Sequence, residues 1–235
     1  MKMFLVLALA GAQMAMALAC GTIASPLACT VNVGGNFIYT FDNFDFINVT
    51  PSGGGKTYAP DDVTLTAGSG GGNSAFLTFT KTSGSTNTGT TFFANSGETT
   101  GVRFSYDVTL TALVPGTAVF TGQPIVNFNA QGLGNGSPSL QMIVTNPPNG
   151  ESCSATLSVQ QGFCDLPPAT TNFLKTGDLL TIFGGTNTAN ATVLSYSNIY
   201  NATFNADTGG GIPEPSTWLM FGAGLATLPF LRKRG

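Results

Sequence analysis

Apolar and polar residues alternate without a break between residues 102 and 111. The apolar members of this run are Val102, Phe104, Tyr106, Val108 and Leu110, and polar residues stand between them. Because successive side chains of a β-strand point to opposite faces, this pattern predicts a strand with one buried face. Residues 37–41 and 194–204 show the same alternation, the second with an interruption at Asn198.

Turn-forming segments rich in Gly, Pro, Asn and Ser separate these runs from several shorter ones. The shorter runs lie at residues 63–66, 75–81, 90–95, 125–130, 140–145, 155–160 and 179–184. Short strands with turns at this spacing are typical of an antiparallel sandwich. We therefore predict an all-β fold with a single antiparallel β-sandwich, jelly-roll-like. A β-helix is the alternative, but it needs a fixed repeat period, and the sequence shows none.

The chain contains no histidine, which excludes Ser-His-Asp catalysis, Cys-His catalysis and histidine-ligated metal sites. It has 8 Lys and Arg residues and 11 Asp and Glu residues. Half of the positive charges lie at the chain ends, at Lys2, Arg232, Lys233 and Arg234. Binding to nucleic acid needs a basic stripe, so we expect no nucleic-acid partner.

The N-terminus has the features of a secretory signal peptide. Lys2 precedes an apolar run that starts at Met3, and Ala17-Leu18-Ala19 matches the A-x-A cleavage pattern, with Ala17 and Ala19 as its small residues. We predict export by the Sec machinery and cleavage after Ala19, which makes Cys20 the first mature residue. A lipoprotein is the alternative, although the position three residues before the cysteine is Ala17 rather than leucine.

The C-terminus combines a short motif, an apolar run and a basic end. Pro213-Glu214-Pro215 is followed by an apolar run from Thr217 to Leu231 and then by Arg232, Lys233 and Arg234. At about 1.5 Å per residue, a helix of this length is shorter than the ~30 Å hydrocarbon core. The basic cluster favours the cytoplasmic side and acts as a stop-transfer signal. A short transmembrane helix of this kind suits a temporary membrane anchor that is later removed.

This tail resembles the PEP-CTERM sorting tail of Gram-negative bacteria. The resemblance covers about residues 211–235 and implies recognition of Pro213, Glu214 and Pro215 by an exosortase. It further implies an inner-membrane intermediate, followed by release or transfer to the cell surface or extracellular space. Proteins of this family are linked to exopolysaccharide and biofilm matrix. Segments around Cys20, Phe41 and Phe104 resemble, more loosely, a group of PEP-CTERM proteins with no assigned activity.

These signals divide the chain into a signal peptide at residues 1–19, a β-sandwich domain at 20–208, a Gly-rich linker at 209–212 and a sorting tail at 213–235. Four cysteines lie in the predicted mature chain: Cys20, Cys29, Cys153 and Cys164. An oxidising envelope favours two local disulfides, Cys20 with Cys29 and Cys153 with Cys164, although four cysteines permit three connectivities.

Carboxylates are the candidate acid–base groups of this histidine-free chain. Glycoside hydrolysis needs two of them facing a cleft, and the candidates are Asp42, Asp45, Glu98, Asp107 and Glu151. Asp61-Asp62 and Asp42/Asp45 are candidate calcium ligands. The simpler interpretation of Asp61-Asp62 is a turn before the strand at Val63, and that of Asp107 is a solvated side chain on a polar strand face. We expect no catalytic residues, no metal site and no cofactor.

The sequence therefore predicts an exported surface or matrix protein with a structural or interaction role linked to exopolysaccharide or biofilm. One alternative is a carbohydrate-binding module that stacks exposed aromatic side chains on sugar rings. A less favoured alternative is a secreted glycoside hydrolase that uses two carboxylates.

Overall fold

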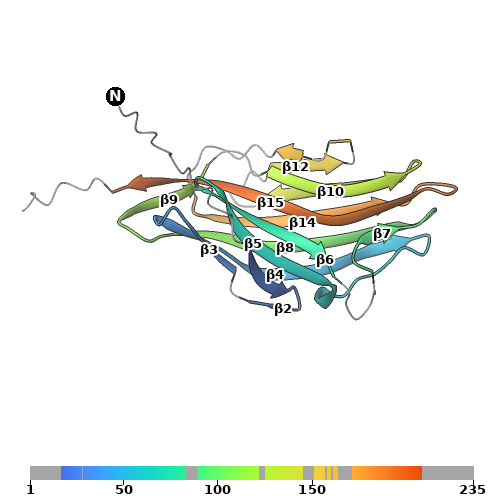
Figure 1. The fold of residues 1–235 in the computed structure, drawn as a ribbon, viewed down its shortest axis with the longest axis horizontal. Coiled ribbons are helices and arrows are strands. Elements are labelled where there is room, and N and C mark those ends of the chain that lie inside the picture. Colours follow the sequence, from blue (N-terminus) through green and yellow to red (C-terminus); the bar gives the residue numbers. More distant parts are fainter. Residues whose placement is uncertain are drawn as a thin grey trace, which may run out of the picture. The chain divides into compact units, whose positions relative to one another are not determined.

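The structure is a computed structural model that describes residues 17–27, 29–82, 89–121, 125–144, 151–156, 158–159, 161–163 and 171–207. The chain divides into two compact units, Met1–Asn205 and Ala206–Gly235. The first unit carries the fold described below (Figure 1). The predicted linker and sorting tail, and residues 1–16 of the predicted signal peptide, lie outside the described residues.

Two antiparallel sheets form this unit. Sheet A contains, in spatial order, β13 (Gln161–Phe163), β10 (Ile125–Leu133), β15 (Asn190–Ala206), β6 (Ser74–Lys81), β5 (Val63–Gly71), β1 (Leu18–Thr22) and β2 (Ser25–Pro26). Two further strands, β7 (Phe92–Ala94) and β9 (Gly116–Phe120), pair with β15. Sheet B contains, in order, β12 (Glu151–Thr156), β11 (Ser137–Val144), β14 (Phe173–Phe183), β8 (Thr99–Ala112), β4 (Phe37–Ser52) and β3 (Cys29–Val33).

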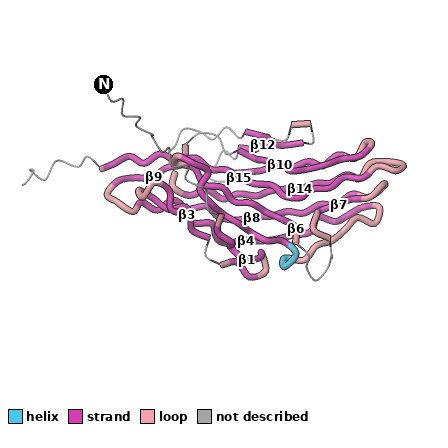
Figure 2. Tube along the Cα trace, viewed as in Figure 1, coloured by secondary structure: helices cyan, strands magenta, loops and turns pink. Residues whose placement is uncertain are grey.

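The structure confirms the predicted all-β class with two antiparallel sheets, an arrangement that fits a β-sandwich. The one helix among the described residues is the short 3-10 turn η1 (Pro60–Asp62), which Figure 2 shows in cyan. Antiparallel neighbours do not fit the β-helix alternative, whose coils stack their strands in parallel. Within the described ranges, no helix is long and apolar enough to span a membrane.

The core lies between the sheets, where the inner faces of both meet. In β8 the five apolar residues of the predicted alternation are all buried, while Arg103 between them is exposed. Phe104 of β8 packs against Phe79 of β6 with ring centroids 5.1 Å apart, and Phe41 of β4 packs against Tyr200 of β15 at 5.9 Å. These aromatic contacts join sheet A to sheet B and place the hydrophobic stabilisation between them.

A β-bulge in β4 changes which residues face the core. The register shifts between Asp42 and Asp45, and Asn43 takes a left-handed backbone conformation with φ of 52°. Phe41 is buried before the bulge, whereas Phe44 and Phe46 pack against the core after it. Because one extra residue inverts the alternation, Asp45 turns to the outer face of sheet B. A second bulge, where β15 pairs with β10, turns Leu194 outward, although the sequence placed it with Tyr196.

A disulfide between Cys20 and Cys29 joins the two sheets at one edge. Cys20 lies in β1 of sheet A and Cys29 in β3 of sheet B, with their Cα atoms 5.2 Å apart and both residues fully buried. This bond confirms the first of the two predicted disulfides. Cys153 lies in β12, opposite Met142 of β11, but Cys164 lies outside the described residues, so the second disulfide stays a prediction.

Candidate functional site

The two outer faces of the unit differ in charge. The strands of sheet A contain a single charged residue, Lys81, and it is buried. Hydroxyl groups fill the outer rows of that sheet instead, with Thr64, Thr66, Thr78, Thr80, Ser195 and Ser197 in register across β5, β6 and β15. Sheet B carries Asp42, Asp45, Arg103, Asp107 and Lys175 on its outer face. Charge-dependent recognition is therefore confined to sheet B among these strands.

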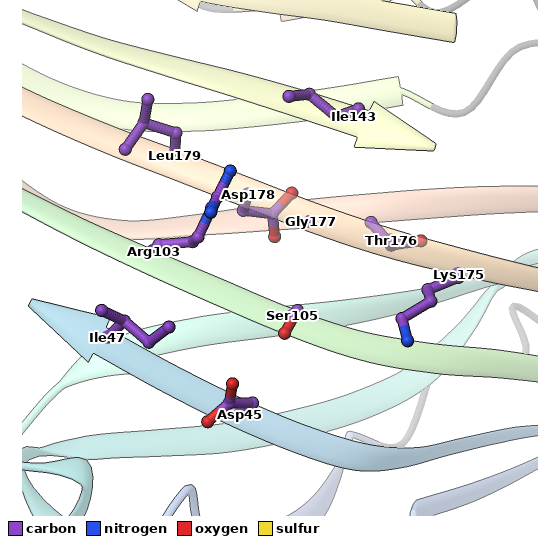
Figure 3. Close-up of a pocket in the computed structure, with 10 residues that line it drawn as sticks. All are labelled: Asp45, Ile47, Arg103, Ser105, Ile143, Lys175, Thr176, Gly177, Asp178 and Leu179. Atoms are coloured by element: carbon purple, nitrogen blue, oxygen red, sulfur yellow. The ribbon is translucent and has the colours of Figure 1, made fainter. Parts of the chain in front are cut away.

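A hollow of about 320 Å³ lies on the outer face of sheet B. The register builds it from three rows of outward residues that cross the strands. The middle row is Ile143, Gly177, Ser105 and Asp45, contributed by β11, β14, β8 and β4. The rows on either side are Gln141, Leu179, Arg103 and Ile47, and Lys175, Asp107 and Asp42. Of these two rows, Leu179, Arg103, Ile47 and Lys175 line the hollow. We call this hollow the trough, and Figure 3 shows the side chains that line it.

Gly177 and Ser105 form the low part of the trough, because both are small and both neighbouring rows carry long side chains. A Cβ built at Gly177 would meet only the carbonyl oxygens of Phe104 and Ile143, at 3.8 and 4.0 Å. Those are ordinary contacts, so backbone crowding does not demand a glycine here. A glycine inside a strand weakens it and often marks a place where a ligand approaches the backbone closely. The missing side chain is what leaves the trough open.

Arg103 and Lys175 stand on opposite sides of this low part (Figure 3). The structure describes four cationic side chains, and the other two lie away from the trough. Lys81 is buried with Asp62 at 3.9 Å, and the ammonium of Lys56 lies 5.5 Å from the ring centroid of Phe93. Both cations that are exposed on a sheet face therefore border the trough.

The carboxylate of Asp45 completes the polar lining of the trough. Its Oδ1 accepts a hydrogen bond of 2.8 Å from the backbone N–H of Phe46, which fixes this side chain beside Ser105. Asp107 and Asp42 lie next to the trough, beyond its lining. Asp107 is directly opposite Lys175, and its Oδ2 accepts a 2.8 Å hydrogen bond from Asn43 of the bulge. Partial burial, and then the nearby charge of Asp107, raise the pKa of Asp42. The trough thus offers two cations, one exposed carboxylate and a hydroxyl within one depression.

Directly beneath the trough, a polar cluster crosses the core. Asp178 of β14 is fully buried, and burial raises the pKa of its carboxyl to about 7. Asn198 of β15 donates from Nδ2 to Oδ2 of Asp178 at 2.7 Å and to the hydroxyl of Tyr106 at 2.5 Å. The hydroxyl of Tyr200 bonds those of Tyr106 at 2.7 Å and Thr176 at 3.1 Å. Asn198, predicted as an interruption of its strand, is in fact an inward residue of this cluster.

The structure places the remaining candidate acids away from the trough. Asp62 is buried in η1, where its Oδ2 accepts a 2.9 Å hydrogen bond from the N–H of Ala59, and it lies near Lys81. Glu98 accepts from the backbone N–H of Asn95 at 2.9 Å, closing a turn. Glu151 begins β12, and its side chain is outside the description. No three His, Cys, Asp or Glu side chains gather as metal ligands within the described part of the chain.

The alternative of a sugar-binding platform needs exposed aromatic side chains, and few of the described aromatic residues are exposed. All five tyrosines are buried, at Tyr39, Tyr58, Tyr106, Tyr196 and Tyr200. Phe44 and Phe46 are partly buried and pack against the core. Phe183, at the end of β14, is the large exposed aromatic of the described residues. Sugar stacking therefore has one candidate on sheet B, whereas polar groups line the trough.

No known protein-family model matches the chain, and no curated protein is significantly similar to it. The resemblance of residues 211–235 to the PEP-CTERM tail stays a prediction, and so do the roles of Pro213, Glu214 and Pro215. These residues and the basic end at Arg232, Lys233 and Arg234 lie outside the described residues.

Sequence reasoning named Asp45 of the trough but not the trough itself. Asp42, Asp45 and Asp107 were candidate acids, and the fold brings them onto one face. Gly177 carried no clear signal, because residues 173–183 show little alternation between polar and apolar residues. Its neighbours in space come from β4, β8 and β11, and only the register between strands brings them together.

Proposed function

We propose that this protein is an exported surface or matrix protein whose sandwich binds exopolysaccharide through the trough on sheet B. The observation that carries the binding role is the open floor at Gly177 between Arg103 and Lys175. Guanidinium and ammonium groups favour carboxylate-bearing sugars. Asp45 and Ser105 supply partners for sugar hydroxyls. We also propose that the strands of the sandwich have the jelly-roll-like connectivity expected from the sequence.

The size of the trough sets the scale of the ligand. Its volume of about 320 Å³ lies at the lower end of small-molecule sites, which span roughly 300–1,000 Å³. It therefore suits a short segment of a polysaccharide chain rather than a long one. Modest affinity at each copy fits a matrix component, because many copies bound to one polymer gain strength through multivalency.

Export and sorting form the second part of the proposal. The signal peptide directs the chain to the Sec machinery, and the C-terminal helix holds the precursor in the inner membrane until an exosortase acts at Pro213-Glu214-Pro215. The Cys20–Cys29 disulfide supports an oxidising destination, since such bonds persist outside the cytosol. Glu214→Ala is expected to leave unprocessed precursor in the inner membrane, and normal processing of this variant would contradict the assignment.

The binding role is tested on columns of immobilised polysaccharide. The exported protein is passed over one uronate-bearing polymer and one neutral polymer, and its retention is measured at rising salt. We expect retention by the uronate polymer alone and a steady loss with salt, because ions screen exposed charges. Arg103→Gln is expected to reduce retention, whereas Lys56→Gln, which changes the net charge equally outside the trough, keeps it. Equal retention of both variants would contradict the site.

A further inference from the structure

We propose that signal peptidase cuts this chain after Ala17, so that the mature protein begins at Leu18 rather than at Cys20. The inference rests on the export proposed above and replaces the cleavage point expected from the sequence. Two overlapping patterns of small residues are present here: Ala15-Met16-Ala17 and Ala17-Leu18-Ala19. Each places alanine at both positions that the peptidase reads, so the pattern also permits a cut after Ala17. The fold shows which of the two products keeps β1 complete.

Leu18 and Ala19 are part of the sheet. They begin β1, where Leu18 pairs with Ala67 and Ala19 with Thr66 of β5. The third pair between the same two strands joins Thr22 to Thr64, beyond a register shift. Cleavage after Ala19 would remove the first two pairs and leave only the third. Cleavage after Ala17 keeps the whole strand.

The position of the new terminal charge gives an independent argument. Cleavage creates an α-ammonium group on the first mature residue. Cys20 is fully buried, its sulfur is bonded to Cys29, and its carbonyl accepts a 2.7 Å hydrogen bond from the N–H of Leu27. A charge at the nitrogen of this buried residue loses hydration, which is unfavourable. Leu18 is 49% exposed, so the same charge at its nitrogen stays close to water.

The disulfide also bears on the lipoprotein alternative. Lipidation would attach a diacylglycerol to Sγ of Cys20 through a thioether, and that sulfur is the one bonded to Cys29. A lipidated Cys20 would leave Cys29 as a buried, unpaired thiol. A mature chain that begins at Leu18 has an ordinary terminus and keeps both cysteines available for their bond.

The test is N-terminal sequencing and intact mass of the exported protein recovered from its native producer. A chain that begins at Leu18 supports the inference. A chain that begins at Cys20, free or lipidated, overturns it and leaves export standing. A chain that still begins at Met1 overturns both this inference and the proposed export, so the two failures are distinguishable.

Two matched variants separate the overlapping patterns. Ala15→Gln changes only the Ala15-Met16-Ala17 pattern, and we expect the product that begins at Leu18 to be lost. Ala19→Gln changes only the other pattern, at an exposed position of β1, and we expect normal processing to Leu18. The opposite outcome, with Ala19→Gln blocked and Ala15→Gln processed normally, would overturn the inference.

Discussion

Asn198 on sheet A donates a 2.7 Å hydrogen bond to the carboxyl group of Asp178 on sheet B, inside the core. Both residues are fully buried. The pair links the sheets through polar atoms in an interior filled mainly with aromatic and aliphatic side chains. The network is only partly satisfied, because Oδ1 of Asp178 and Oδ1 of Asn198 are buried without a hydrogen-bond partner among the described residues. An unsatisfied carboxylate oxygen in the core disfavours the charged form of Asp178.

The first prediction concerns the pH dependence of stability. The pKa of Asp178 is about 7 in the folded protein, because burial favours the neutral acid, and about 3.9 in an unfolded chain. Between these values the folded state holds a proton that the unfolded state has lost. The contribution of Asp178 is therefore complete below about pH 4 and falls as pH rises to about 7.

Asp178→Asn isolates this effect, since the amide has the shape of the acid and does not ionise. We expect the variant to be more stable than the wild type at pH 8, by up to roughly 4 kcal/mol, and to lose most of that advantage at pH 4. Chemical denaturation at a series of pH values measures the difference. An advantage that is constant across this range would show that Asp178 does not titrate as described.

The second prediction concerns the disulfide. Replacing both Cys20 and Cys29 by alanine removes a bond between β1 and β3 and is expected to lower the free energy of unfolding by about 2–3 kcal/mol. Denaturation of the variant and of the wild type, each with and without reductant, measures the loss. Reductant is expected to destabilise the wild type more than the variant. An equal effect on both would mean that this bond does not stabilise the fold.

The third prediction compares two glycines, Gly177 and Gly184, that differ in the space around them. Gly177→Ala is expected to stabilise the protein by about 0.4–1 kcal/mol, because the new Cβ meets ordinary contacts and the unfolded chain loses freedom. Gly184→Ala is expected to destabilise it, since the Cβ would lie 1.8 Å from the carbonyl oxygen of Asn95. Thermal melting ranks the two variants against the wild type. A destabilising Gly177→Ala would mean that the backbone needs this glycine.

The fourth prediction concerns the buried pair of Asp62 and Lys81. Asp62→Asn removes the nearest carboxylate of the buried Lys81 ammonium, and we expect a loss of about 3–5 kcal/mol. The matched control is Asp61→Asn at the adjacent exposed position, for which a change below about 1 kcal/mol is expected. Urea denaturation measures both. Similar losses for the two variants would assign the effect to η1 rather than to the ion pair.

The period-two alternation predicted the fold class and most of the inner face, because a strand with one buried face carries apolar residues at every second position. It placed Val102, Phe104 and Tyr106 in the core correctly. It failed near Asp42 and Leu194, where bulges invert the alternation without a clear signal in one sequence. The polar core residue Asn198 was missed for a related reason, since a buried amide breaks the apolar pattern that reveals an inward position.

The trough could not be predicted from the sequence because it depends on the register between neighbouring strands. Gly177, Ser105 and Asp45 lie far apart along the chain and become neighbours only when β14, β8 and β4 align. The order of strands in a sheet, and the residue at which each pair starts, depend on packing over the whole domain. Local spacing therefore named the acids Asp45 and Asp107 but not the glycine between the two cations.

The central claim is that the open floor at Gly177 binds a uronate-bearing polysaccharide. Its most direct test is Gly177→Val, which fills the trough, compared with Thr66→Val on the hydroxyl face of sheet A. Affinity for the soluble polymer is measured by calorimetry for the wild type and both variants. The account predicts at least about tenfold weaker binding for Gly177→Val, equivalent to about 1.4 kcal/mol, and unchanged binding for Thr66→Val. Wild-type affinity in Gly177→Val, with its fold intact, would contradict it.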